Sequence, residues 1–235
     1  MTIEAIIFDF DGVLLESEYA GNRHLAETLT GLGHPTSVED SMANFMGLAG
    51  SDFLDAISAW IGGPVPPAFH AIRDEEDDRM IREGIAPVAG AVDFVRGLSP
   101  ALPRAIASSS STRWIAAHLD HLGIGDAFDG RIFSGREHVA RGKPAPDLYL
   151  HAAQAIGADI RNTLIIEDSP VGVTGALASG AHVVGLCVGQ HCAPDHDARL
   201  RALGVEIVVK SFDEIALFLA GLATHSMPVP GYASR

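Results

Sequence analysis

Two patterns of hydrophobic positions alternate along most of the chain. Short, almost wholly apolar runs are typical of buried strands; they lie at residues 3–8, 103–108, 131–133, 163–167, 182–187 and 206–209. Longer segments with apolar residues at helical spacing lie at 90–98, 112–122, 146–157, 170–180, 195–203 and 212–222. Strands that alternate with helices in this way predict an α/β fold with a Rossmann-like, doubly wound parallel sheet.

The segment between residues 16 and 87 follows only the helical pattern. Helices are predicted at 17–32, 51–61 and 66–83, and Ser37 with Asp40 three residues later predicts a capping box that opens another helix. We therefore expect an all-helical cap, residues 16–87, inserted into a core made of residues 1–15 and 88–222. Residues 223–235 lack periodicity and are expected to form a flexible tail.

The chain carries an excess of negative charge, with 30 Asp and Glu against 16 Lys and Arg and a formal net charge of −14. Such a charge repels nucleic acid and anionic membrane surfaces, so neither is an expected partner. It also repels phosphorylated ligands at long range. Any phosphate site therefore needs local positive charge, from a metal ion or from a few placed cations.

Two further features bear on the compartment. The apolar run from Ala5 to Phe8 is far too short for a signal peptide or a membrane span. The two cysteines, Cys187 and Cys192, imply no disulfide framework. We therefore expect a cytoplasmic protein. Separately, we expect it to be a monomer or a weak oligomer.

Four short polar motifs stand at or near the carboxyl ends of predicted strands. They are DFDG at residues 9–12, the serines at 108–110, GKPAPD at 142–147 and EDS at 167–169. In an open α/β sheet, ligands bind at the edge formed by the carboxyl ends of the strands. The motifs are therefore expected to meet in one site.

The residue types in these motifs indicate phosphoryl chemistry. Four carboxylates would crowd the site, those of Asp9, Asp11, Glu167 and Asp168. Such crowding needs a cation or protons, and hard carboxylate oxygens suit Mg²⁺. Lys143 adds a second positive charge, while Ser108 and Ser109 can donate hydrogen bonds to phosphoryl oxygens. Positioning and charge neutralisation of this kind are what phosphoryl transfer requires.

The spacing of Asp9 and Asp11 suggests separate roles. A strand would turn both side chains to one face and Phe10 to the other. One carboxylate, ionised and on the metal, could attack phosphorus. The other, held off the metal, could give a proton to the leaving oxygen and later take one from the hydrolytic water.

The ordered motifs DFDGV, ASSSS, GKPAPD and IIEDSPVGVTGA resemble those of the haloacid dehalogenase superfamily, and the resemblance covers nearly all of residues 3–220. The pattern is most similar to the helical-cap branch that includes β-phosphoglucomutase. The later stretch GQHCAPDHDARLRALGVEIVV resembles members of the 6-phosphogluconate phosphatase type.

The resemblance implies a role for each motif residue. Asp9 would be the nucleophile and a Mg²⁺ ligand, and Asp11 the general acid and base, with its backbone carbonyl on the metal. Ser108 and Lys143 would hold the phosphoryl group. Asp168 would bind Mg²⁺, and Glu167 would do so directly or through water.

A phosphatase acting on a small phosphorylated metabolite is the favoured function, with two alternatives. In a β-phosphoglucomutase-like mutase the cap loop carries two cations, for which Met46 and Gly50 stand here, and Gly21 replaces a histidine. A phosphoaspartate signalling module would lack the cap and would have no use for Asp11. Phosphonate cleavage needs a cap lysine, and residues 1–142 contain none.

The remaining candidates lie in the cap and near the C-terminus. Arg23 and Arg73 are the cap cations expected to read the far end of a sugar or sugar-acid phosphate. The acidic run at residues 74–78 is expected to be a solvated helix face. The segment from Cys187 to His196 matches no common zinc spacing and is expected to be a loop near the cap entrance.

Overall fold

Six parallel strands form a single sheet in the computed structural model, which describes residues 2–46, 48 and 50–225. Their spatial order is β3-β2-β1-β4-β5-β6. The strands are β1 Ala5–Phe8, β2 Arg104–Ser108, β3 Ile132–Ser134, β4 Thr163–Glu167, β5 His182–Leu186 and β6 Ile207–Val209. The chain thus starts in the middle of the sheet and builds outward to both sides, which confirms the predicted Rossmann-like fold.

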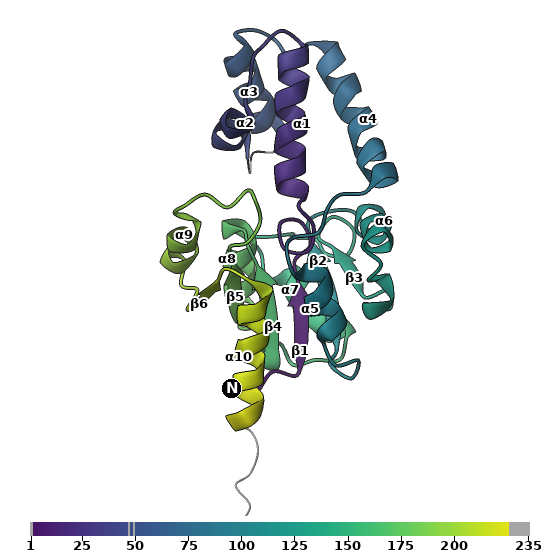
Figure 1. Ribbon diagram of the computed structural model, residues 1–235, viewed down its shortest axis with the longest axis vertical. Helices are drawn as coiled ribbons and strands as arrows, with labels where there is room; N and C mark the ends of the chain where they lie inside the picture. The colour runs from purple at the N-terminus through teal and green to yellow at the C-terminus, as the bar shows by residue number, and fades with distance from the viewer. Residues whose placement is uncertain (1, 47, 49, 226–235) are drawn as a thin grey trace, which may run out of the picture.

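Helices cover both faces of this sheet (Figure 1). The helices are α5 Ala91–Gly97, α6 Thr112–Leu122, α7 Asp147–Ala155, α8 Pro170–Ala178, α9 His196–Ala202 and α10 Phe212–His225. Successive side chains of a strand point to opposite faces. Ile6 and Phe8 therefore pack with α5, α6 and α10, whereas Ile7 packs with α7, α8 and α9. Burial on both faces explains why the strands are mostly apolar and do not alternate between apolar and polar residues.

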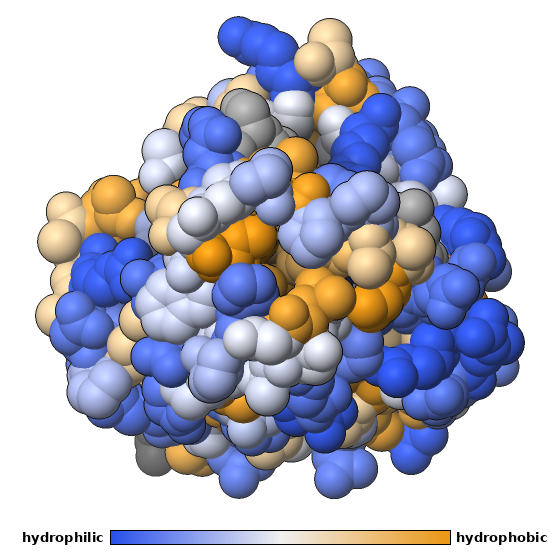
Figure 2. Space-filling view, turned by 90° about the horizontal axis from the view of Figure 1, so that it is seen from above, coloured by the Kyte–Doolittle hydropathy of each residue, from blue (hydrophilic) through white to orange (hydrophobic). Residues whose placement is uncertain are grey.

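Four helices stand above the carboxyl ends of the strands (Figure 1). They are α1 Ser17–Gly31, α2 Val38–Phe45, α3 Gly50–Ile61 and α4 Pro67–Glu83. These helices have their own apolar cluster, which includes Leu29, Ile57 and Phe69. Viewed from this end, hydrophobic side chains gather near the middle of the face and hydrophilic ones lie around it (Figure 2). Their action as a cap, and the core and cap boundaries, stay predictions.

Two chain segments connect these helices to the sheet. The first follows β1, and the second returns after α4. The two are joined by hydrogen bonds from Glu16 N to Ala86 O at 3.0 Å and from Val88 N to Leu14 O at 3.1 Å. The connection is therefore a paired, two-stranded neck.

Most predicted elements differ from the observed ones by only a residue or two. The capping box of α2 is confirmed, because Ser37 Oγ accepts from Asp40 N and Asp40 Oδ2 accepts from Ser37 N. The predicted tail is partly wrong: α10 continues to His225, so residues 223–225 are helical. Residues 226–235, like residues 47 and 49 of the compared mutase loop, lie outside the described part.

The acidic run on α4 is also different from the prediction. Glu76 is only 2% exposed, and its carboxylate contacts His24 of α1 and Arg73 of its own helix. The run is therefore not uniformly a solvated face. Within the described residues, no helix is long and apolar enough to cross a membrane.

Candidate active site

A cavity of about 810 Å³ lies between the carboxyl edge of the sheet and the helices above it. Its floor is formed by residues that follow β1, β2 and β4, together with Lys143 from the segment before α7. Its other walls include apolar side chains of the upper helices and of the segment after α2, namely Leu25, Phe45, Met46, Leu48 and Phe53. Each of the four predicted motifs supplies at least one residue to this cavity. The cap arginine Arg73 also lines it, whereas Arg23 does not.

Three carboxylates and one lysine form the deepest part of the site. Asp9, Glu167 and Asp168 are buried, and each offers an oxygen within 4.8 Å of those of the other two. Lys143 Nζ donates to Asp9 Oδ1 at 2.7 Å and to Glu167 Oε1 at 2.6 Å. The ammonium is therefore held between the end of β1 and the end of β4, where parallel neighbours bring these residues together.

The charges in this cluster act strongly on one another. Burial, and then the neighbouring Glu167, raise the pKa of Asp9 and of Asp168 well above the usual range. Burial alone would lower the pKa of Lys143, but Asp9 and Glu167 outweigh it and raise that pKa well above its ordinary value. Burial also opposes ionisation of Glu167, yet Lys143 lowers its pKa overall. The protein alone thus keeps a Lys143–Glu167 ion pair and leaves Asp9 and Asp168 in need of further positive charge.

Glu167 is saturated with hydrogen-bond donors. Its Oε1 accepts from Lys143 Nζ and from Tyr149 Oη at 2.8 Å. Its Oε2 accepts from the backbone of Asp168 and from the backbone and hydroxyl of Ser169, at 2.9–3.1 Å. A Cβ at Gly172 would collide with this carboxylate, so the first turn of α8 needs glycine there. Glu167 is therefore fixed mainly as the partner of Lys143.

Asp11 lies in a separate set of contacts. Oδ1 accepts from Ser17 Oγ at 2.7 Å and from Trp114 Nε1 at 3.1 Å. Oδ2 accepts from Ser108 Oγ at 3.1 Å and from Ser110 Oγ at 2.6 Å. Both side chains line the same cavity, as expected, but strand alternation does not set them there, because β1 ends at Phe8 and both residues follow it. Asp11 is instead held apart from the acidic cluster, at the side of the cavity near α6.

The donor set fits a hard divalent cation. Asp168 Oδ1 is buried and has no hydrogen-bond partner among the described residues. A buried carboxylate oxygen without a partner is costly unless a cation or a proton joins it. Oxygen atoms of Asp9 and Asp168 lie close enough to share one ion. The residues therefore suit Mg²⁺, which prefers a few carboxylate oxygens and keeps its remaining positions for water and phosphate.

The predicted binding residues are divided between two places. Ser108, Ser109 and Arg73 line the main cavity with Lys143. Arg23 lines a different cavity of about 220 Å³ between α1 and α4. Of the two cap arginines, Arg73 therefore stays the candidate for contact with a ligand in the main cavity.

Several residues of the cavity were not among the predicted ones. They include the Asp11 donors Ser17, Ser110 and Trp114, two arginines at the rim, Arg136 and Arg199, and the buried histidines His191 and His196. Ser110 stood inside a recognised motif, and Arg136 follows a strand end, so both carried a usable signal. Trp114, His191 and Arg199 reach the cavity only because of how their helices and loop pack.

Comparisons with known proteins agree with this arrangement. A model of the haloacid dehalogenase-like hydrolases matches residues 3–180. The chain is 29% identical to hexitol phosphatase A of Escherichia coli (strain K12) over 220 residues, which cover 92% of this chain and 95% of that protein. It is 26% identical to 6-phosphogluconate phosphatase of the same organism over 194 residues, covering 82% of this chain and 86% of that one.

Solved structures show the same fold. A hydrolase of this family from Deinococcus radiodurans R1, with bound phosphate and sodium, superposes with a TM-score of 0.83 at 32% identity. The match covers 94% of this chain and 97% of that chain.

Proposed function

The chain belongs to the haloacid dehalogenase-like hydrolases, and we propose that it is a Mg²⁺-dependent phosphatase that hydrolyses a small phosphorylated sugar or sugar acid. The observation that carries this proposal is the separation of two carboxylates. Asp9 lies in the buried cluster with Lys143 and Asp168, whereas Asp11 is held by four donors at the side of the same cavity. A nucleophile and a proton carrier need such different surroundings.

Asp9 is the proposed nucleophile. One of its carboxylate oxygens attacks phosphorus, the bond from phosphorus to the leaving oxygen breaks, and an aspartyl phosphate forms. Asp11 gives its proton to the leaving oxygen. In the second step a water attacks the same phosphorus, Asp11 takes a proton from that water, and the bond to Asp9 breaks to give inorganic phosphate.

Lys143 and Ser108 are the proposed phosphate-binding groups, with Ser109 at the cavity wall. Lys143 is nearly buried, with a side chain only 4% exposed, and its ammonium already faces Asp9. A charge placed there acts on the phosphoryl oxygens through little intervening water. Ser108 also donates to Asp11, so it connects the phosphate site with the proton carrier.

Asp9, Asp168 and the main-chain carbonyl of Asp11 would hold Mg²⁺, and Glu167 would act on it through water because its own oxygens are already satisfied. When bound, the ion offsets the negative charge of the carboxylates and of the phosphoryl oxygens. The named relatives support the sugar-phosphate class, because one is a hexitol phosphatase and the other a 6-phosphogluconate phosphatase.

A phosphatase is favoured over a mutase by the walls of the cavity. A mutase must hold a doubly phosphorylated intermediate, which needs cations on the cap side. Here Met46 lines the cavity together with Leu48 and Phe53, and Arg73 is the cation that α4 supplies to the same wall. That wall suits one phosphate and a leaving group that carries at most one further anionic group.

The direct test is Asp9→Asn, which we expect to abolish turnover of p-nitrophenyl phosphate and of sugar phosphates, because the amide is a poor nucleophile. Acid-quenched wild-type protein should carry covalent phosphate during turnover, and Asp9→Asn should carry none. Asp93→Asn, at an exposed position on α5, is the matched control and should behave like wild type. Excess EDTA should stop the wild-type reaction, and full activity in EDTA would contradict the metal requirement.

A further inference from the structure

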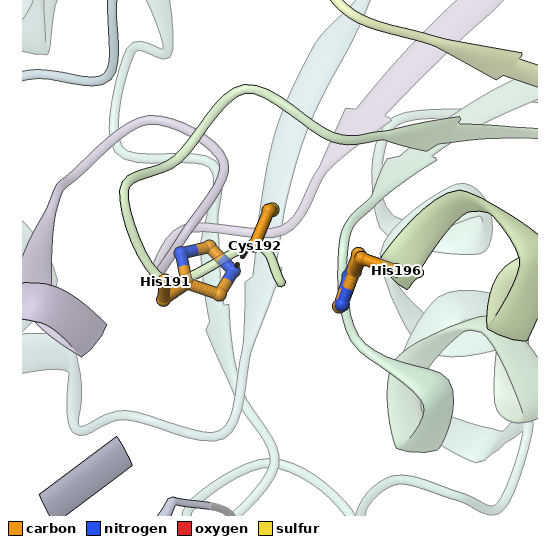
Figure 3. Close-up of side chains that lie close together, drawn as sticks. All are labelled: His191, Cys192 and His196. Atoms are coloured by element: carbon orange, nitrogen blue, oxygen red, sulfur yellow. Dashed lines mark hydrogen bonds between the residues drawn. The ribbon is translucent and has the colours of Figure 1, made fainter. Parts of the chain in front are cut away.

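The loop after β5 and the first residue of α9 direct two buried histidines at one residue of the active site. His191 Nε2 lies 2.7 Å from Asp168 Oδ2, and His196 Nε2 lies 2.6 Å from the main-chain oxygen of Asp168. The two histidines are only 5% and 4% exposed. Figure 3 shows His191 on this loop, with Cys192 beside it, and His196 at the start of the helix that follows. Asp168 is thereby contacted at both its side chain and its backbone.

The direction of these contacts follows from the acceptors. A carbonyl oxygen and an ionised carboxylate can only accept, so each Nε2 carries the proton and donates it. His191 thus occupies Oδ2 of Asp168, while Oδ1 is the buried oxygen that lacks a partner among the described residues. The histidine selects which carboxylate oxygen is left for a cation.

The fold makes room for His191 in a specific way. Gly12 has a φ of 80°, and a Cβ there would collide with Asp168 Oδ2 and crowd His191 Cε1. The loop is also tied to the neck below the cap, because Gln190 N donates to Glu16 Oε2 at 3.1 Å. His191 therefore packs into a fitted position between the first motif and Asp168.

We propose that His191 and His196 are positioning residues that hold Asp168 ready to bind the metal, His191 by its carboxylate and His196 by its backbone. This inference rests on the proposed function, since it assigns the metal to Asp168. Hydrogen bonds to a ligating carboxylate fix its orientation, and their loss typically lowers metal affinity ~10–100-fold. The histidines do not touch the reacting atoms and act only through Asp168.

A second interpretation of the same loop is a zinc site. His191, Cys192 and His196 each offer a ligand atom within 4.8 Å of the others, and Cys192 Sγ lies 3.6 Å from His191 Nε2. That nitrogen, however, already donates to Asp168, and so does His196 Nε2. A zinc ion on either Nε2 would have to remove that nitrogen from Asp168, whereas Nδ1 of each histidine is buried without a hydrogen-bond partner among the described residues. The two Nε2 contacts favour the positioning role, and zinc analysis separates it from the metal site.

The test measures Mg²⁺ binding to metal-free protein by calorimetry, without substrate. His191→Leu fills the space without a donor and should bind Mg²⁺ ~10–100-fold more weakly. His191→Gln keeps an N–H donor and should recover most of the affinity, and His196→Leu should weaken binding as well. Cys192→Ser is the matched control and should bind Mg²⁺ like wild type. In turnover, the loss in His191→Leu should be reversed by raising Mg²⁺.

Each other outcome decides the question. If wild type binds Mg²⁺ and His191→Leu binds it equally well, the positioning role is wrong while the proposed function stands. If the Mg²⁺ affinity of His191→Gln falls as far as that of His191→Leu, the hydrogen bond is not what supports metal binding, and the positioning role is again wrong. If purified wild type contains stoichiometric zinc and Cys192→Ser contains none, the loop is a zinc site and the positioning role is wrong. If wild type binds no Mg²⁺, the proposed function itself fails. Equal urea unfolding of all variants in EDTA confirms that each has folded.

Discussion

Asp9 and Asp11 are separated by a single residue, yet they meet different surroundings. Asp9 is buried beside Lys143 and two carboxylates, whereas Asp11 is partly exposed and accepts hydrogen bonds from three hydroxyls and an indole. The sequence was enough to bring both to the same edge of the sheet. It suggested separate roles for them but could not show what holds them apart, because that depends on where β1 ends and on α6, which carries Trp114 from a distant part of the chain.

The proposed acid role of Asp11 can be tested at this scale. Asp11→Asn removes the transferable proton, and positioned proton transfer typically contributes ~10²–10⁴-fold. We expect a loss of that size in kcat with a sugar phosphate, whose leaving alkoxide is strongly basic. The loss with p-nitrophenyl phosphate should be much smaller, because its leaving group needs little protonation. Equal losses on the two substrates would show that Asp11 is not the acid.

At the scale of helices and strands, hydrophobic periodicity carried most of the information. The buried strand β1 is apolar at every position, β4 is apolar between Thr163 and Glu167, and helices such as α6 have a buried stripe, so their limits could be predicted closely. The burial of Glu76 could not be predicted, because a run of acidic residues gives no sign that one of them faces another helix. The contact of Glu76 on α4 with His24 on α1 decides it.

Glu76 should make the stability of the protein depend on pH. Burial raises its pKa from 4.5 to about 7, although Arg73 and Arg79 oppose the shift and His24 of α1 faces the same carboxylate. Between these two values the folded protein binds more protons than the unfolded chain does. The stability from this group is thus complete below pH 4.5 and is lost as pH rises to about 7.

Replacing Glu76 by Gln should remove that part of the pH dependence. The loss it accounts for is on the order of 3 kcal/mol, since each pH unit between the two pKa values is worth about 1.4 kcal/mol. Urea unfolding between pH 5 and pH 8 should show a smaller decline in unfolding free energy for Glu76→Gln than for wild type. Glu75→Gln, at an exposed neighbouring position, should decline as wild type does. Parallel curves for Glu76→Gln and wild type would show that the carboxyl titrates normally.

At the scale of the whole molecule, the net charge of −14 makes the placement of each cation important. Lys143, Arg73, Arg136 and Arg199 all line the main cavity, although they come from the core, the upper helices and the rim. Local positive charge at a phosphate site was expected from composition alone. Lys143 could be predicted from its motif. The choice between the cap arginines could not be predicted, because helix periodicity limits how many arginines of α4 face the cavity but does not say which.

Arg73 is the cap residue expected to distinguish one phosphate ester from another. It lines the main cavity from α4, whereas the phosphoryl-binding groups belong to the core, so it can contact the far end of the leaving group. Arg73→Ala should lower kcat/KM for a sugar-acid phosphate such as 6-phosphogluconate ~10–100-fold, the size of one lost charged hydrogen bond. Turnover of p-nitrophenyl phosphate, which offers no such group, should be almost unchanged.

Arg23→Ala is the matched control, because Arg23 is also a cap arginine but lines the smaller cavity between α1 and α4. It should leave kcat/KM for both substrates close to the wild-type values. A discriminating effect in Arg23→Ala and none in Arg73→Ala would reverse the assignment of the two arginines. Arg73→Ala could instead lower kcat/KM for both substrates by the same factor. Its effect would then come through Glu76 and the packing of α4, since Arg73 Nη1 donates to Glu76 at 3.0 Å. Only a loss of kcat/KM confined to the sugar-acid phosphate would show that the guanidinium contacts the leaving group.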